Sequence, residues 1–241
     1  MQLDATKTVR EVALAIPNAT RVFEKIKIDY CCGGDRLLGD ACARAGIQIN
    51  EVEQLLNENA AAPGGEPADF QHLSLAELIV HILEKHHVFT KSEMARIESL
   101  IAKVVAAHGQ RHPELLSARD LLGQLSDDLR PHMFKEEQIL FPYIVEFEQS
   151  VLQQRPGPFA PFGSVNNPIR MMMMEHDAVG EILRELRKVT SDYSVPSDGC
   201  ISYQTLYQAI EAFEQDLHQH IHLENNILFP KAIALDQKSE Q

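Results

Sequence analysis

Two matching histidine–glutamate pairs are the residues of this chain whose types and spacing predict chemistry. Both occur in copies of the motif H-x-x-x-E-x-x-I-L-F-P, one with His132 and Glu136 and the other with His220 and Glu224. Residues four apart lie on one face of a helix, about one turn from each other. Nitrogen and oxygen ligands without thiolate suit iron or manganese. The repeated motif therefore predicts a metal site built from two helices.

Two further histidines match each other upstream of the copies. His87 precedes the first copy by almost the same interval as His176 precedes the second. A repeated helix pair places a nearly symmetric site between its halves. His86 is a rival to His87, but the alignment of the two halves favours His87. No such match exists for His81, His108 or His112.

Each histidine–glutamate pair lies within an apolar stripe that follows one helical face. A single histidine on such a face is more often a hydrogen-bonded core residue than a ligand. However, burying a carboxylate is costly unless a partner compensates its charge. Two carboxylates with four imidazoles, arranged in two matching halves, are best explained by bound cations.

The elements that would position these residues are four long amphipathic segments, separated by glycine and proline. Four such segments with short connections indicate an antiparallel helical bundle, so we expect an all-α protein. A smaller helical unit comes first, and a stretch rich in alanine, glycine and proline follows it. The expected segments are 74–107, 113–149, 166–190 and 200–235; the expected domains are 1–59 (small helical domain), 60–71 (linker) and 72–236 (bundle).

Charge and composition exclude several classes of partner. The chain of 241 residues has a formal net charge of −13, with 35 acidic and 22 basic residues. Phosphate binding needs a basic surface, so we expect no nucleic acid partner and no anionic membrane surface. No apolar stretch has the length of about 20 residues that spans a bilayer, and the first residues do not read as a signal peptide. We therefore expect a cytoplasmic protein with reduced thiols.

A pair of neighbouring cysteines, Cys31 and Cys32, precedes two glycines. Asp35 is a good N-cap, so we expect a helix to begin there. A thiolate near a helix N-terminus is stabilised by the helix dipole, which lowers its pKa and raises its reactivity. The alternative is that one cysteine is simply buried. Cys42 and Cys200 are interpreted as structural.

Two parts of the sequence resemble those of a known protein family. Residues 74–235, with their H-x-x-x-E ligands, resemble the hemerythrin-like bundle. The segment Ile28-Asp29-Tyr30-Cys31-Cys32-Gly33-Gly34 resembles the small cysteine-containing domain, of the ScdA N-terminal type, of the RIC ("repair of iron centers") proteins. Together the two parts cover nearly the whole chain.

The resemblance implies a stress-induced protein that repairs iron–sulfur clusters damaged by nitrosative and oxidative chemistry. It implies two non-haem iron ions, bridged by the glutamates and by an oxo or hydroxo group. It further implies a cytoplasmic homodimer, with damaged or apo iron–sulfur proteins as partners. Cys31 and Cys32 would exchange electrons, nitric oxide or iron with the bundle. The implied iron ligands are His87, His132, Glu136, His176, His220 and Glu224.

Two departures separate this chain from the oxygen-carrying hemerythrins. Gly180 stands where those proteins have a further histidine, and the last helix has H-x-x-x-E in place of H-x-x-x-x-D. We expect a more open iron pair, which favours iron donation over oxygen storage. The alternatives are a nitric oxide reductase forming nitrous oxide and a sensor of nitric oxide or oxygen, so whether the chain is an enzyme stays open.

Overall fold

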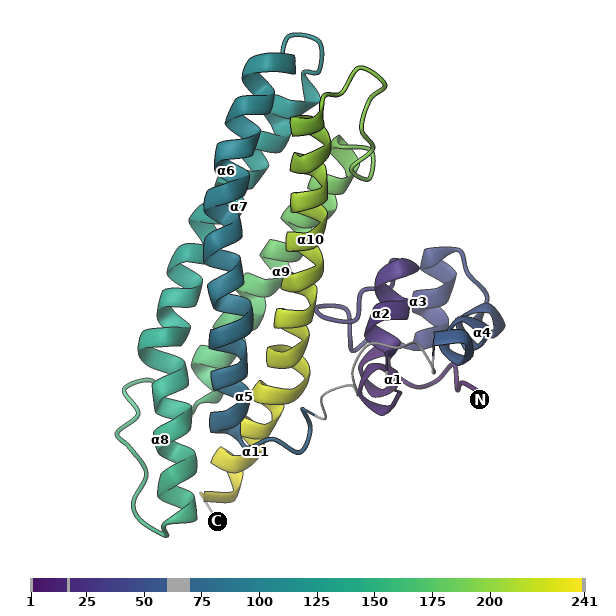
Figure 1. Ribbon diagram of the computed structural model, residues 1–241. Helices are drawn as coiled ribbons and strands as arrows, with labels where there is room; N and C mark the ends of the chain where they lie inside the picture. Colours follow the sequence, from purple (N-terminus) through teal and green to yellow (C-terminus); the bar gives the residue numbers. More distant parts are fainter. Residues whose placement is uncertain (1, 17, 60–69, 240–241) are drawn as a thin grey trace. The chain divides into compact units, whose positions relative to one another are not determined.

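The computed structural model describes residues 2–16, 18–59 and 70–239. These residues form helices and connecting loops, with a single isolated β-bridge between Thr8 and Leu37. The predicted all-α fold, with a helical bundle preceded by small helices, is confirmed (Figure 1). The linker predicted over residues 60–71 lies, except for its last two residues, outside the described part of the chain.

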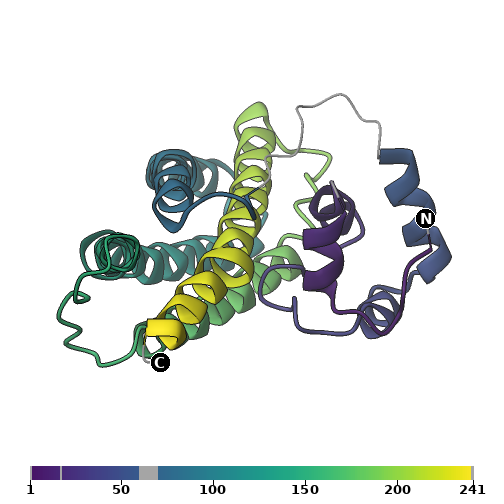
Figure 2. The ribbon, with the colours of Figure 1, turned by 90° about the horizontal axis from the view of Figure 1, so that it is seen from below.

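Four short helices make up the N-terminal part: α1 (Val9–Ala15), α2 (Ala19–Lys25), α3 (Leu38–Ala45) and α4 (Ile49–Asn59). These helices lie next to one another (Figure 2). Their common apolar core includes Val9, Phe23, Leu38 and Val52. A capping box opens α1, since Thr8 accepts from the Glu11 backbone while the Glu11 side chain accepts from Thr8.

The start of α3 corrects one expectation. The helix expected to begin at Asp35 begins at Leu38, with Leu37 as its N-cap. The Asp35 carboxylate instead forms an ion pair with Arg10, and Gly33 and Arg36 close a turn through a backbone hydrogen bond. The acidic residue therefore stabilises a turn ahead of the helix and does not cap it.

The remaining helices form four long rods. The first rod consists of α5 (Leu75–His81), η1 (Ile82–His87) and α6 (Val88–His108), and the second of α7 (Glu114–Lys135), η2 (Glu136–Leu140) and α8 (Phe141–Leu152). The third rod is the single helix α9 (Asn166–Val189). The fourth rod consists of α10 (Ile201–Leu223), η3 (Glu224–Leu228) and α11 (Phe229–Ser239). The connection between the first two has only five residues, which makes these rods antiparallel neighbours. Side-chain pairs such as Arg187 with Glu214 join the third rod to the fourth.

The segments η1, η2 and η3 are short π-helical turns inside the rods. In η2 the Phe141 N–H reaches back five residues to the Glu136 carbonyl, and in η3 Phe229 does the same with Glu224. Such π-turns are rare in proteins overall, and those that occur are frequently found at functional sites. Here η1 ends at a predicted ligand, while η2 and η3 each begin at one.

By packing, the chain divides into two compact units. One consists of the residues up to Ser74 together with His218–Lys231, and the other of Leu75–Leu217 together with the residues from Ala232 onward. Helix α10 continues without a break through the boundary at residue 217. Among the described residues, no helix is long and apolar enough to cross a membrane.

Candidate metal centre

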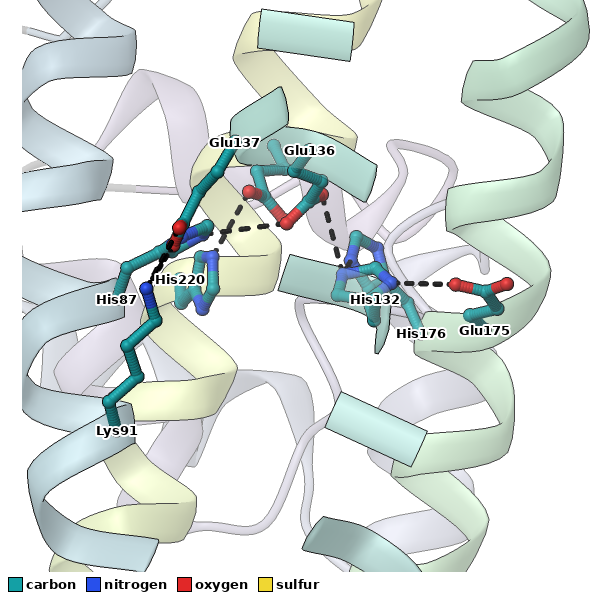
Figure 3. Close-up of polar contacts among 9 residues, drawn as sticks. His87, Lys91, His132, Glu136, Glu137, Glu175, His176 and His220 are labelled. Atoms are coloured by element: carbon teal, nitrogen blue, oxygen red, sulfur yellow. Dashed lines mark hydrogen bonds and ion pairs between the residues drawn. The ribbon is translucent and has the colours of Figure 1, made fainter. Parts of the chain in front are cut away.

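Glu136 lies between two imidazoles. Its carboxylate oxygens face different rings: Oε2 lies 3.4 Å from His87 Nε2, and Oε1 lies 3.3 Å from His132 Nε2. The ring of His176, on α9, lies beside that of His132, with 3.1 Å between their Nε2 atoms. Figure 3 shows these side chains turned toward one another from the first three rods. The two oxygens of one carboxylate therefore lie next to two different histidines.

The second copy of the motif has the same internal arrangement. His220 Nε2 lies 3.0 Å from Glu224 Oε1, one helical turn further along. His220 is on α10, and Glu224 is the first residue of η3. The four-residue spacing thus brings imidazole and carboxylate together in both copies.

The six predicted ligands make up two groups of possible metal donors. In each group, one ligand atom per residue lies within 4.8 Å of the others. Both groups contain both glutamates, so the same pair of carboxylates could contact a metal ion in either group. The groups are His87, Glu136, His220 and Glu224, and His132, Glu136, His176 and Glu224.

The burial of these residues tests whether cations fit. Both glutamates are fully buried, and each of the four histidines is at most 3% exposed. Among the described residues, the buried set contains no lysine or arginine to balance the two carboxylates. Buried carboxylates need compensation by positive charge, and imidazole with carboxylate donors is a set that iron, manganese and zinc accept. The donor set therefore fits bound metal cations.

A second layer of carboxylates holds two of the histidine rings from outside. His87 Nδ1 lies 2.7 Å from Glu137 Oε1, and His132 Nδ1 lies 2.8 Å from Glu175 Oε2. Such contacts fix the ring orientation and tautomer of metal-binding histidines. The repeat does not predict this role for Glu137 and Glu175, because the two acids do not occupy matching positions in its two halves.

Each outer carboxylate also contacts a lysine. Lys91 donates to Glu137 at 2.6 Å and 2.8 Å, and Lys135 donates to Glu175. The hydrogen bond from His132, together with Lys135, lowers the pKa of Glu175 to about 2. Burial raises the pKa of Glu137, but the hydrogen bonds from Lys91 and His87 outweigh it and lower that pKa. Both outer acids are therefore ionised at neutral pH.

His86, the rival of His87, faces elsewhere. Its Nδ1 lies 3.0 Å from Asp216 Oδ1, and its ring stacks edge-on against His81. It belongs to neither group of donors around the glutamates. The geometry therefore places His87, not His86, beside Glu136.

Asp29 organises the turn that holds the cysteine pair. Its Oδ1 accepts the backbone N–H groups of Cys31, Cys32 and Gly33 at 3.2, 3.0 and 2.9 Å. All four cysteines are free, and the Sγ atoms of the neighbouring pair are 3.9 Å apart. Neither Cys31 nor Cys32 belongs to the two donor groups.

The expected lowering of the Cys31 pKa by a helix dipole is not found, and the alternative of a buried cysteine holds for Cys31. The nearest helix start, at Leu38, is several residues away, and Cys31 is buried. The contact with Cys32 and this burial raise the pKa of Cys31 well above its ordinary value. Cys200, expected to be structural, is exposed.

The cysteine turn contacts the segment that carries the second motif copy. Asn226 donates to the Tyr30 carbonyl at 3.0 Å and accepts from Arg10 Nε at 2.7 Å. His222 is buried beside the same carbonyl, and burial lowers its pKa to about 4. His222 is therefore a buried residue that contacts the cysteine turn and does not belong to the two donor groups.

Comparisons with known proteins agree with both parts of the chain. Residues 78–232 match the family described as "Hemerythrin HHE cation binding domain", and residues 5–60 match "Domain of Unknown function (DUF542)", the ScdA N-terminal domain. Over 227 residues the chain is 35% identical to the iron-sulfur cluster repair protein YtfE of Dickeya chrysanthemi, covering 94% of this chain and 96% of that protein. The chain belongs to the family of hemerythrin-like iron–sulfur cluster repair proteins.

Within this family it is also 34% identical over 230 residues to a probable iron-sulfur cluster repair protein of Haemophilus influenzae, covering 95% of this chain and 97% of that one. A YtfE protein of Escherichia coli O81 is 35% identical over 224 residues, which are 93% and 95% of the two chains.

Proposed function

We propose that this chain holds two iron ions in the buried centre and donates iron for the repair of damaged iron–sulfur clusters. The observation that carries the proposal is the pair of donor groups sharing Glu136 and Glu224. Its relatives over nearly the full length are named as iron–sulfur cluster repair proteins. Damaged or apo iron–sulfur proteins are the acceptors that this function requires.

In this proposal each metal position takes two imidazoles and an oxygen from each shared carboxylate. His87 and His220 supply one position, and His132 and His176 supply the other. The two carboxylates bridge the positions, with an oxo or hydroxo group as the further bridge. Such a centre, when loaded, supplies ferrous or ferric iron in a nitrogen and oxygen environment without thiolate.

The small number of protein donors makes the bound iron exchangeable. Each group offers four protein donors, while iron in nitrogen and oxygen sites commonly accepts further ligands at open positions. Gly180, buried one turn after His176, adds no donor. Nitric oxide or oxygen are the small ligands that such open positions would take, and a departing iron ion needs the same access.

The proposal is tested by iron transfer from the full-length, iron-loaded chain to an apo iron–sulfur protein. We expect two iron ions per chain by elemental analysis, and recovery of the acceptor's cluster absorbance when sulfide is supplied. The double variant His132→Ala, Glu136→Ala should lose both the iron and the transfer. A matched double variant at exposed positions, His72→Ala with Glu98→Ala, should behave as the unaltered chain does.

The outcomes separate donation from the other activities. A loaded chain that never releases iron to the acceptor, even with a chelator present, contradicts iron donation. Steady production of nitrous oxide from nitric oxide with a reductant would assign the centre to catalysis. The homodimer and the cytoplasmic setting are part of the proposal by resemblance alone, and light scattering of the purified chain tests the dimer.

A further inference from the structure

A third cluster of possible metal donors lies at the opposite end of the first rod from η1. It consists of His108, His112 and Asp198, with one ligand atom of each within 4.8 Å of the others. His108 is the last residue of α6, and α6 spans 21 residues after His87. At a rise of 1.5 Å per residue, the cluster is about 30 Å from the metal centre. It is therefore a separate site, and the repeat that explains the centre does not account for it.

His112 is oriented as the histidines of the centre are. Its Nδ1 lies 3.1 Å from Glu114 Oε1, and its Nε2 lies 2.9 Å from Asp198 Oδ1. In the centre, His87 likewise has Nδ1 on the outer acid Glu137 and Nε2 toward the shared carboxylate. Metal-binding histidines almost always place the second ring nitrogen on a carboxylate, a carbonyl or water. Glu114 fills that role for His112.

His108 supplies an independent observation. Its ring is 6% exposed, and among the described residues its Nδ1 has no hydrogen-bond partner. Leaving a buried polar group without a partner costs about 1–3 kcal/mol. The rings of His112 and Tyr203 pack beside it, with centroids 6.1 Å and 5.5 Å away. A cation in the cluster would give this imidazole a partner.

Asp198 is held with one oxygen turned toward the histidines. It lies in a tight turn closed by the hydrogen bond from Gly199 N–H to the Pro196 carbonyl at 2.9 Å. A Cβ on Gly199 would come within 2.6 Å of the Val195 side chain, so this turn needs glycine. Arg111 Nη1 binds the other oxygen, Oδ2, at 2.9 Å. The hydrogen bond from His112 is the main reason that the pKa of Asp198 is lowered, and the carboxylate is ionised at neutral pH.

We propose that His108, His112 and Asp198 bind a zinc ion at this end of the bundle. Zinc takes nitrogen ligands from histidine and oxygen ligands from carboxylate, and three protein ligands leave its fourth position to water. The Asp198 side chain is 42% exposed, so an ion can reach the cluster from solvent. The bound ion joins the α6–α7 connection to the loop between α9 and α10. Its effect is therefore on the stability of this end and not on the iron content.

The same contacts have an explanation without metal. A protonated His112 between Glu114 and Asp198 would form two ion pairs and need no zinc. Zinc binding by the full chain separates the two accounts. The iron-loaded chain is dialysed against zinc at graded concentrations, and bound zinc and iron are both measured by elemental analysis. We expect one zinc ion per chain with no loss of iron.

Three variants and one control identify the ligands. Asp198→Asn, which keeps the shape of an exposed side chain, and His112→Ala should each abolish this zinc ion. Glu114→Gln should retain it with an affinity about 10–100-fold weaker, since Glu114 acts on the ring and not on the ion. Asp120→Asn should change nothing. Asp120 is an exposed aspartate bound to a neighbouring arginine, Arg119, at 2.8 Å, so the control removes the same charge from a similar pair.

The proposal is overturned if the unaltered chain binds no zinc while its iron is retained. It is also overturned if zinc binds equally to the unaltered chain and to Asp198→Asn, or only in exchange for iron. Circular dichroism and iron content of each variant show that it is folded, so an absence of zinc in a folded variant reports on the ligands.

Discussion

At the scale of single residues, the centre depends on imidazole rings held from both sides. For His87 and His132, Nε2 faces Glu136, while Nδ1 contacts an outer acid that also binds a lysine. The lysine compensates the charge of the outer acid. The acid therefore stays ionised and accepts a hydrogen bond from the Nδ1–H group of the histidine. The inner nitrogen is left as the lone-pair donor that a metal requires.

Removing an outer acid should therefore weaken metal binding without removing a ligand. We expect Glu137→Gln and Glu175→Gln each to weaken iron binding about 10–100-fold, because the amide no longer fixes the tautomer of its histidine. Competition with a chelator at equilibrium measures the change. Glu98→Gln is the matched control, since Glu98 is an exposed acid bound to Arg130 at 2.6 Å. Equal affinities for all three variants would show that the outer acids do not orient the rings.

At the scale of elements, the π-turns set the register between the ligands and the rest of the core. Each of η2 and η3 starts at a glutamate ligand, and a proline follows two residues after each ends. Proline has no N–H to donate, so the wider turn comes just before a position where an α-helical hydrogen bond cannot form anyway. The extra residue rotates the following helix relative to the ligands by about 100°.

Deleting one exposed residue from η2 tests this register. Without Gln138 the turn should revert toward α-helical spacing, which sets Glu136 out of phase with the buried Ile144 and Phe147. We expect iron affinity to fall by at least about tenfold, since lesser disturbances outside the ligand shell already cost that much. Circular dichroism should still report a helical chain. Deleting Gln154, in the loop after α8, is the control, and an equal loss there would contradict a role for the π-turn.

Spacing alone could predict which residues of the two motif copies meet, because four residues make one helical turn. It could also predict the four rods, since Gly and Pro mark their ends. The π-turns could not be predicted, because an inserted residue changes neither composition nor the local apolar pattern. Burial along the apolar stripe could not be predicted either: Ile139 in η2 is 49% exposed, while Ile227, at the same position of η3, is buried.

Contacts between residues that are distant in sequence could not be predicted, for a different reason. Which acid meets His132 Nδ1 depends on how α9 packs, and Glu175 precedes His176 by one residue and so lies on another face. The start of α3 depended on whether Asp35 capped a helix or paired with Arg10. Both outcomes are decided by tertiary contacts, which local sequence does not encode.

At the scale of the whole molecule, one segment serves two purposes. Residues 218–231 carry His220 and Glu224, and they also contact the cysteine turn through His222 and Asn226. The two sets alternate along the helix and therefore face different sides. A disturbance of the cysteine turn should thus reach the segment that bears two predicted ligands.

The contact between this segment and Gly34 makes that coupling measurable. A Cβ on Gly34 would lie 3.1 Å from Asn226 Oδ1 and 3.2 Å from the Tyr30 carbonyl, so in Gly34→Ala both groups must shift by a few tenths of an ångström, which strains the hydrogen bond that Asn226 Nδ2 donates to that carbonyl. We expect the free energy of unfolding in urea to fall by about 1–3 kcal/mol, as for other overpacked sites, and the release of iron to a chelator to become faster.

The matched control is another glycine-to-alanine substitution, at a position where the added Cβ has no close neighbour. A Cβ on Gly123, inside α7, meets nothing within 4 Å. Alanine also lowers the conformational entropy of the unfolded chain, so Gly123→Ala should stabilise the fold by about 0.4–1 kcal/mol and leave iron release unchanged. If Gly34→Ala lowers stability but releases iron at the unaltered rate, the cysteine turn stabilises the chain without influencing His220 and Glu224. Faster release in Gly34→Ala alone means that the N-terminal unit controls how firmly these two residues hold their metal.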